Sequence, residues 1–338
     1  IMYSIIMSSV ATGTIITMTS HHWLLAWIGL ELNTLAIIPI IAKQHSPRAT
    51  EATTKYFLTQ AAASATILFA STMNAWHTGT WDISQLTNQP ACALLTTALA
   101  MKLGLAPLHF WLPEVLQGTT LKTALIIATW QKLAPAALLY LVHNSTSPTI
   151  LLTMGILSTI IGGWGGLNQT QMRKIMAFSS IANLGWMATI LTINPNIMLL
   201  NLVLYIFMTT PLFLTLMLTS SKTVKDLTTT WTISPSITAL VLLLLMSLGG
   251  LPPLTGFIPK WLILQELTTH DLPTTATILA LSALLSLFFY LRLSYTSTLT
   301  VFPTTTKSAY KWRFQPKLST TPMATTTAIS LLLLPMTP

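Results

Sequence analysis

Charged residues are scarce in this sequence. Only 7% of its 338 residues are Asp, Glu, Lys or Arg, whereas 52% are hydrophobic. An ordinary soluble domain carries about 25% charged residues. Such a chain cannot cover a surface that faces water, so the composition excludes a soluble globular fold.

Cysteine is almost absent as well. A single thiol, Cys92, cannot form an internal disulfide, hold an iron–sulfur cluster or build a thiolate zinc site. The glycine-rich stretch 162–166 lies in an apolar run and lacks the lysine and hydroxyl pair of a nucleotide-binding loop. No two histidines are placed at mid-depth as a haem pair would need. We therefore expect no cofactor and no metal site on this chain.

Long apolar runs recur from end to end, and each is long enough to cross a hydrocarbon core about 30 Å thick. We interpret the first run as a span and not as a signal peptide, because it has no basic head. The sequence thus predicts an all-α integral membrane protein of about eleven spans, at residues 2–20, 23–42, 52–73, 92–116, 120–142, 149–166, 172–193, 197–219, 236–265, 273–296 and 320–337.

The formal net charge of +9 could suggest nucleic-acid binding, but membrane topology explains it. Lysine and arginine fall after every even-numbered predicted span, and the opposite loops contain neither. This alternation predicts that the N-terminus faces the positive-inside compartment and the C-terminus the other one. The basic loops hold Lys43 and Arg48, Lys122, Arg173 and Lys174, Lys222 and Lys225, and finally Lys307, Lys311, Arg313 and Lys317.

The fourth and ninth predicted spans share their punctuation. Segments 103–114 and 249–260 lie 146 residues apart, and each has a glycine near its start and two prolines six residues apart. The two spans run in opposite directions, as in the inverted-topology repeats of secondary transporters. We expect helix breaks at Pro107, Gly249, Gly250, Pro252 and Pro253. The alternative is two proline kinks that look alike by chance.

The repeat divides the expected single membrane domain into three parts. The first half-repeat covers about 1–145, the second about 146–300, and a C-terminal loop and last helix cover about 301–338.

Four charged residues lie deep in the predicted spans. Each costs about 2.5–3.5 kcal/mol at the bilayer centre. Such residues either hold helices together through pairing or snorkelling, or they serve transport. They are Glu31, Lys102, Lys132 and Lys260, and Lys55 lies nearer a helix end, where a structural role competes more strongly.

These residues indicate proton transfer. Burial disfavours the charged form of a lysine, so a buried lysine can both take up and release a proton. We expect Glu31 to pair with Lys55 and, on separation, to act on the next lysine. His109 stands seven residues after Lys102, on nearly the same helix face if the break does not rotate it. It either relays protons or hydrogen-bonds carbonyls freed by Pro113.

Several segments together resemble the antiporter-like subunits of respiratory complex I, and the resemblance covers essentially the whole chain. The matching motifs are Trp-Ile-Gly-Leu-Glu-Leu-Asn at 27–33, the segment 102–114, Trp-Gln-Lys-Leu-Ala-Pro at 130–135, Lys-Ile-Met-Ala-Phe-Ser-Ser-Ile at 174–181 and the segment 249–257. Full-length bacterial members of this family have fourteen helices. The eleven or so spans predicted for this chain are similar to those of the animal members, which lack the first three helices.

The resemblance implies a proton-pumping membrane subunit of an NADH:ubiquinone oxidoreductase in the mitochondrial inner membrane, with the basic loops on the matrix side. NADH, FMN, the iron–sulfur clusters and ubiquinone would belong to other subunits. Partners would be neighbouring membrane subunits, antiporter-like ones included, and lipids such as cardiolipin. The family's membrane acid corresponds to Glu31, its partner to Lys55, its channel lysines to Lys102 and Lys132, and its exit-side residue to Lys260.

Two other readings remain open at this point. A separate cation/proton antiporter would share the broken helices and buried lysines, and would be active alone in liposomes. A structural membrane scaffold would carry no proton path, and neutral replacement of Lys102 would leave pumping unchanged.

Overall fold

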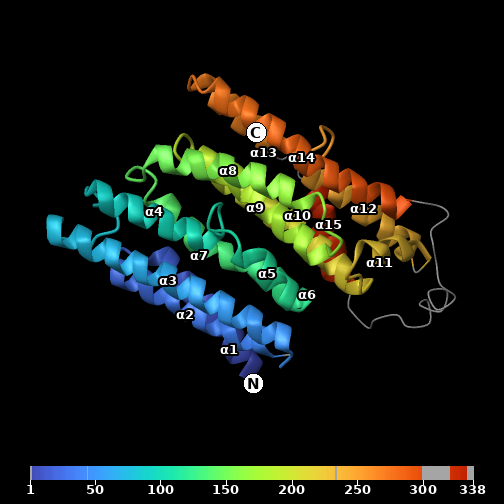
Figure 1. The fold of residues 1–338 in the computed structure, drawn as a ribbon, viewed down its shortest axis with the longest axis horizontal. Coiled ribbons are helices and arrows are strands. Elements are labelled where there is room, and N and C mark those ends of the chain that lie inside the picture. The colour runs from blue at the N-terminus through green and yellow to red at the C-terminus, as the bar shows by residue number, and fades with distance from the viewer. Residues whose placement is uncertain (1, 44, 233, 299–319, 333–338) are drawn as a thin grey trace. The chain divides into compact units, whose positions relative to one another are not determined.

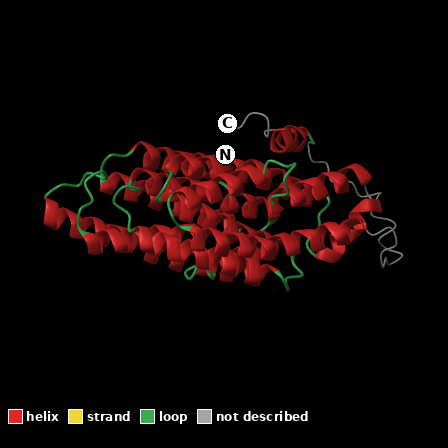
Figure 2. Ribbon diagram, turned by 90° about the horizontal axis from the view of Figure 1, so that it is seen from above, coloured by secondary structure: helices red, strands yellow, loops and turns green. Residues whose placement is uncertain are grey.

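The structure is a computed structural model that describes residues 2–43, 45–232, 234–298 and 320–332 (Figure 1). Within these ranges the regular elements are helices joined by loops, and no β-strand is present (Figure 2). The basic stretch from Lys307 to Lys317 and the end of the last predicted span lie outside the described residues.

The chain divides into two compact units, Ile1–Ser158 and Thr159–Pro338. In the first unit α2 packs against α1 and α3, and α3 packs against α4 and α5. Its helices are α1 (Met2–Thr19), α2 (Trp23–Ala42), α3 (Pro47–Thr78), α4 (Gln89–Leu103), α5 (Trp111–Gly118), α6 (Leu121–Ala128), the 3₁₀ turn η1 (Trp130–Lys132), α7 (Leu133–Leu141) and the first part of α8 (Pro148–Gly166).

The second unit contains the rest of α8. Its helix α12 packs against α10, α14 and α15. The further elements are α9 (Met172–Leu191), α10 (Pro195–Leu218), α11 (Val224–Thr228), the 3₁₀ turn η2 (Thr229–Thr232), α12 (Pro235–Gly249), α13 (Phe257–Thr269), α14 (Pro273–Thr298) and α15 (Thr321–Leu332).

Local sequence signals set several of these boundaries. The α3 helix begins where Ser46 accepts a hydrogen bond from the Ala49 backbone N–H and Pro47 takes the first helical position. It ends at Gly79, which has a left-handed backbone. The helix is therefore longer at both ends than the predicted span 52–73.

Seven helical segments among the described residues are long and apolar enough to cross a membrane: Met2–Thr19, Trp23–Ala42, Leu121–Leu141, Pro148–Gly166, Met172–Leu191, Pro195–Leu218 and Pro273–Thr298. The predicted all-α membrane class is thereby confirmed. The count of eleven spans stays a prediction: of the other predicted spans, 92–116 and 236–265 are divided into shorter helices, 52–73 lies in the continuous but less apolar α3, and the last ends outside the described residues.

The two predicted helix breaks are confirmed, and they have the same backbone geometry. The α4 helix ends at Gly104 and α12 ends at Gly250, with φ of 85° and 81°. In each case the glycine N–H and the next residue's N–H turn back to carbonyls of the last helical turn. The left-handed conformation favours glycine at both positions, because glycine has no Cβ to crowd the backbone. The offset of 146 residues seen in the sequence therefore recurs in the backbone.

A third interruption differs from the prediction of a continuous helix at 120–142. The α6 helix stops at Ala128, the 3₁₀ turn η1 follows, and α7 begins at Leu133. The physical reason is Pro135, which has no N–H to donate to the carbonyl four residues earlier and whose ring crowds that carbonyl. A short 3₁₀ stretch inside a helix commonly marks such a site.

Candidate functional site

Lys102 occupies the last turn of α4, directly before the break at Gly104. Its side chain is buried, with 5% of its surface exposed. The Nζ atom has no hydrogen-bond partner among the described residues. Glu31 on α2 interacts with it electrostatically. The site thus holds a buried ammonium whose three donors are unused beside an acid.

A small cavity adjoins Lys102. The centre of a water molecule can move within about 10 Å³ of this cavity. This is close to the smallest volume that holds one water molecule. The polar part of its lining can supply the two to four hydrogen bonds that a buried water makes. The lining residues are Leu30, Asn33, Thr34, Tyr56, Gln60, Lys102, Trp111, Gln131 and Pro135.

Lys132 lies in the interruption between α6 and α7, as the last residue of η1. It is 3% exposed, so both central lysines of the first unit are buried. Lys102 lies in the last turn of α4, and Lys132 lies in the interruption between α6 and α7. Sequence reasoning found the residue, but not the interruption that carries it.

Glu31 lies on α2, whose end contains Pro39. Its Oε2 atom is buried and has no hydrogen-bond partner within the described part of the chain. Besides Lys102, the carboxylate interacts electrostatically with Tyr56 on α3.

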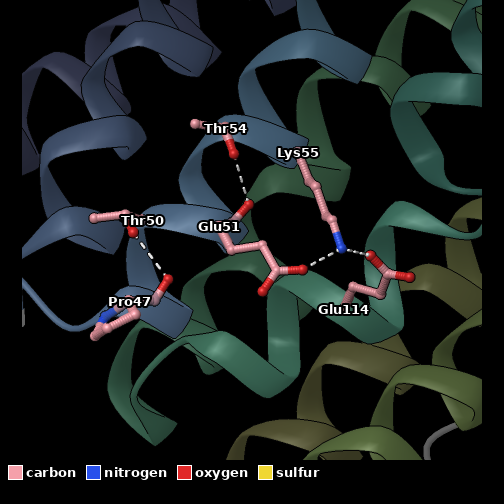
Figure 3. Close-up of polar contacts among 6 residues, drawn as sticks. All are labelled: Pro47, Thr50, Glu51, Thr54, Lys55 and Glu114. Atoms are coloured by element: carbon pink, nitrogen blue, oxygen red, sulfur yellow. Dashed lines mark hydrogen bonds and ion pairs between the residues drawn. The ribbon is translucent and has the colours of Figure 1, made fainter.

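The expected pair of Glu31 with Lys55 is wrong for this structure. Figure 3 shows the Lys55 ammonium between two other carboxylates, those of Glu51 and Glu114, each at an N–O distance of 2.5 Å. Glu51 stands four residues before Lys55 on α3, so both point from one helix face. Glu114 comes from α5, which packs against α3.

All three side chains of this cluster are substantially exposed in the isolated chain, by 40% at Lys55, 62% at Glu51 and 50% at Glu114. The cluster therefore differs in kind from the buried Lys102 and from Glu31, whose Oε2 atom is buried. Glu114 was missed as a partner of Lys55. The spacing of Glu51 and Lys55 was the only signal in the sequence, and the contact of α5 with α3 was not readable there.

A hydrogen-bonded bridge of neutral side chains crosses the same region. The Tyr56 hydroxyl donates to Gln131 Oε1 at 3.3 Å, and Gln131 Nε2 donates to Asn33 Oδ1 at 2.7 Å. The bridge joins α3, η1 and α2. Sequence reasoning quoted Asn33 and Gln131 only as parts of motifs, and nothing local predicts their contact.

His109 lies in the turn between α4 and α5 and is 4% exposed. Its ring packs against Phe110 with a centroid distance of 4.3 Å. No hydrogen bond joins it to Lys102 among the described residues, so the proton relay between them stays a prediction.

Lys260 belongs to the second unit and caps the broken end of α12. Its Nζ atom donates to the carbonyl of Gly249 at 2.8 Å and to that of Leu248 at 3.5 Å. A cation at a helix C-terminus offsets the negative end of the helix dipole. The ammonium therefore has a structural task in addition to any role in transport.

Within the described residues, no group of three or more His, Cys, Asp or Glu side chains could hold a metal ion.

The chain presents broken α-helices, each with a lysine at the break, and an acid beside one of these lysines. These features define the class of antiporter-like membrane subunits.

Comparison with known proteins narrows this class. The family model of the NADH:quinone oxidoreductase/Mrp antiporter membrane domain matches residues 20–286, and that of the NADH dehydrogenase subunit 2 C-terminus matches residues 287–338. The chain therefore belongs to the NADH:quinone oxidoreductase/Mrp antiporter family, in agreement with the resemblance found in the sequence.

Individual relatives agree with this assignment. NADH-ubiquinone oxidoreductase chain 2 of Salmo salar is 59% identical over 99% of this chain and 96% of its own length. A chain of respiratory complex I from Thermus thermophilus is 27% identical with a TM-score of 0.84, covering 99% of this chain and 79% of that one. A chain of the Mrp complex from Dietzia, 16% identical with a TM-score of 0.80 over 96% of this chain and 73% of that one, shares the fold.

Proposed function

We propose that the chain is a proton-translocating membrane subunit of an NADH:ubiquinone oxidoreductase. Protons move through buried side chains, and the chain carries out no redox chemistry of its own. Family membership and the full-length likeness to chain 2 of this enzyme support the proposal.

The observation that carries the proposal is the state of Lys102. A buried ammonium without a hydrogen-bond partner among the described residues is electrostatically unfavourable, because burial removes the water that would stabilise its charge. Glu31 is the acid that interacts electrostatically with this ammonium. Lys102 can therefore take up a proton when Glu31 is ionised and release it when Glu31 is neutralised.

Two further lysines are proposed as proton-transfer groups, one in each unit. Lys132 is the next buried amine in the same unit, and Lys260 is the amine at the second break. Because Lys260 holds two carbonyls of α12, loss of its proton would weaken the end of that helix. We assign His109, in the turn that follows α4, as a further proton-transfer group.

Lys55 has a different task in this proposal. Its ammonium forms ion pairs with Glu51 on α3 and Glu114 on α5, so a displacement of Lys55 would alter the contacts of both helices. We place it as the control residue of the site, because its ion pair with Glu114 ties α3 to α5, the helix that follows the break after Lys102.

The same proposal covers location and partners. The chain lies in the mitochondrial inner membrane with its N-terminus on the matrix side and its C-terminus on the intermembrane-space side. It contacts other membrane subunits, including antiporter-like neighbours, and lipids. NADH, FMN, iron–sulfur clusters and ubiquinone bind to other subunits.

Replacement of Lys102 by methionine tests the proposal, since methionine keeps most of the volume and removes the charge. Protons pumped per electron are measured in the assembled complex reconstituted into vesicles, with electron transfer measured in parallel. We expect assembly to persist and the proton-to-electron ratio to fall. Lys122→Met is the matched control, because Lys122 is exposed at the start of α6.

An unchanged ratio in Lys102→Met would refute the carrier role and favour the scaffold reading. Sodium-dependent or proton-dependent exchange by the purified chain alone in liposomes would favour the stand-alone antiporter.

A further inference from the structure

The bridge of Tyr56, Gln131 and Asn33 joins three elements that carry or neighbour the ionisable residues of the first unit. Gln131 directly precedes Lys132 in η1, Tyr56 directly follows Lys55 on α3, and Asn33 lies two residues after Glu31 on α2. Asn33 and Tyr56 are buried, at 2% and 1% exposure. A single amide thus holds the turn of Lys132 to both helices.

The same network reaches the turn of Lys102. The Tyr56 ring meets the Trp111 ring edge-on, with centroids 5.8 Å apart and an angle of 66° between the planes. The Trp111 Nε1–H donates to the carbonyl of Met101 at 3.1 Å. Met101 is the neighbour of Lys102, so both central lysines stand next to residues of one connected network.

Gln131 is the member of the network that directly precedes Lys132 in η1. Because Pro135 interrupts the regular helical hydrogen bonding at η1, this turn is held less by its own backbone than an ordinary helical turn. A side-chain bond of 2.7 Å to a buried amide supplies the missing constraint. Gln131 and Asn33 also line the cavity beside Lys102.

We propose that Gln131 is a positioning residue that fixes Lys132 relative to Lys102 through its amide bridge between Tyr56 and Asn33. The inference rests on the proposed function, since it gives the bridge a role in proton transfer between the two lysines. Gln131 itself carries no proton. When the bridge opens, η1 gains freedom and the two lysines lose their fixed separation.

The test uses the assembled complex in vesicles and the number of protons pumped per electron. Gln131→Leu keeps the approximate volume and removes both hydrogen bonds. We expect a lower proton-to-electron ratio with electron transfer retained, because loss of both hydrogen bonds frees η1 and the position of Lys132. A purely structural effect would reduce the amount of complex, and with it pumping and electron transfer together, leaving the ratio unchanged.

Three further variants separate the possible outcomes. Gln265→Leu makes the same replacement on an exposed helix face and should keep the wild-type ratio. Tyr56→Phe removes one hydroxyl and should lower the ratio less than Gln131→Leu. The double variant of Tyr56 and Gln131 should be no worse than Gln131→Leu alone, because both changes open the same bridge.

A wild-type ratio in Gln131→Leu, together with a reduced ratio in Lys102→Met, would overturn the positioning role and leave the proposed function intact. A wild-type ratio in Lys102→Met would overturn the proposed function and this inference with it. If Gln131→Leu does not assemble, Tyr56→Phe decides, and a wild-type ratio in that variant refutes the inference.

Discussion

Replacing Lys260 by methionine tests whether its ammonium holds the broken end of α12. The last four carbonyls of a helix have no donor within the helix. In α12 the first two of these accept from the Gly250 backbone N–H. The last two, those of Leu248 and Gly249, accept from Lys260 Nζ. Methionine cannot donate, so it leaves this second pair without its partner.

The size of the effect follows from the kind of bond that is lost. Hydrogen bonds from a charged donor contribute about 1.5–3 kcal/mol. The free energy of local opening at the end of α12 should fall by about this amount in Lys260→Met. Amide hydrogen exchange, which reports local opening, should accelerate there by roughly tenfold to a hundredfold.

The assay is hydrogen exchange with mass spectrometry on the assembled complex, followed in peptides that contain the amides of Gly250 and Leu251. Both amides bond back into the last turn of α12. Lys260→Arg keeps a cation and should retain most of the protection. Lys225→Met replaces an exposed lysine of α11 and is the matched control.

Unchanged exchange of the two amides in an assembled Lys260→Met complex would refute the cap. A change of the proton-to-electron ratio alone, without faster exchange, would mean that Lys260 acts in transport and not in holding the helix.

Three other experiments have defined outcomes. Gly104→Ala and Gly250→Ala each place an alanine in a left-handed backbone, at a cost of about 1–2 kcal/mol. Gly250→Ala should lower the melting temperature more, because its new Cβ would lie 3.0 Å from the Lys260 side chain that caps α12. Equal melting temperatures would contradict this. Arg292→Gln removes the guanidinium hydrogen bonds to the carbonyls of Leu167 and Gln169, just beyond α8, and should destabilise the complex by about 1.5–3 kcal/mol. Arg292→Lys lacks the planar fork of the guanidinium and should restore only part of this stability. Full stability of Arg292→Gln would show that these two hydrogen bonds do not stabilise the complex. Glu114→Gln should lower thermal stability in the wild-type background and have no effect in a Lys55→Met background, so additive effects in the double variant would disprove their pairing.

The sequence by itself determined the membrane class, because the transfer of side chains into hydrocarbon is a property of composition and needs no knowledge of contacts. It also determined the two helix breaks. Glycine and proline act on their own backbone, so a break at Gly104 or Gly250 is a local event that can be read directly. The buried charges were found for the same reason, since their depth follows from their place in an apolar run.

Only the tertiary structure decided which side chains meet. Lys55 finds Glu114 because α5 packs on α3, and Gln131 finds Asn33 across 98 residues of sequence. Such pairs depend on how helix faces are turned toward one another. In an apolar chain that information is weak, because faces that meet protein and faces that meet lipid have the same composition.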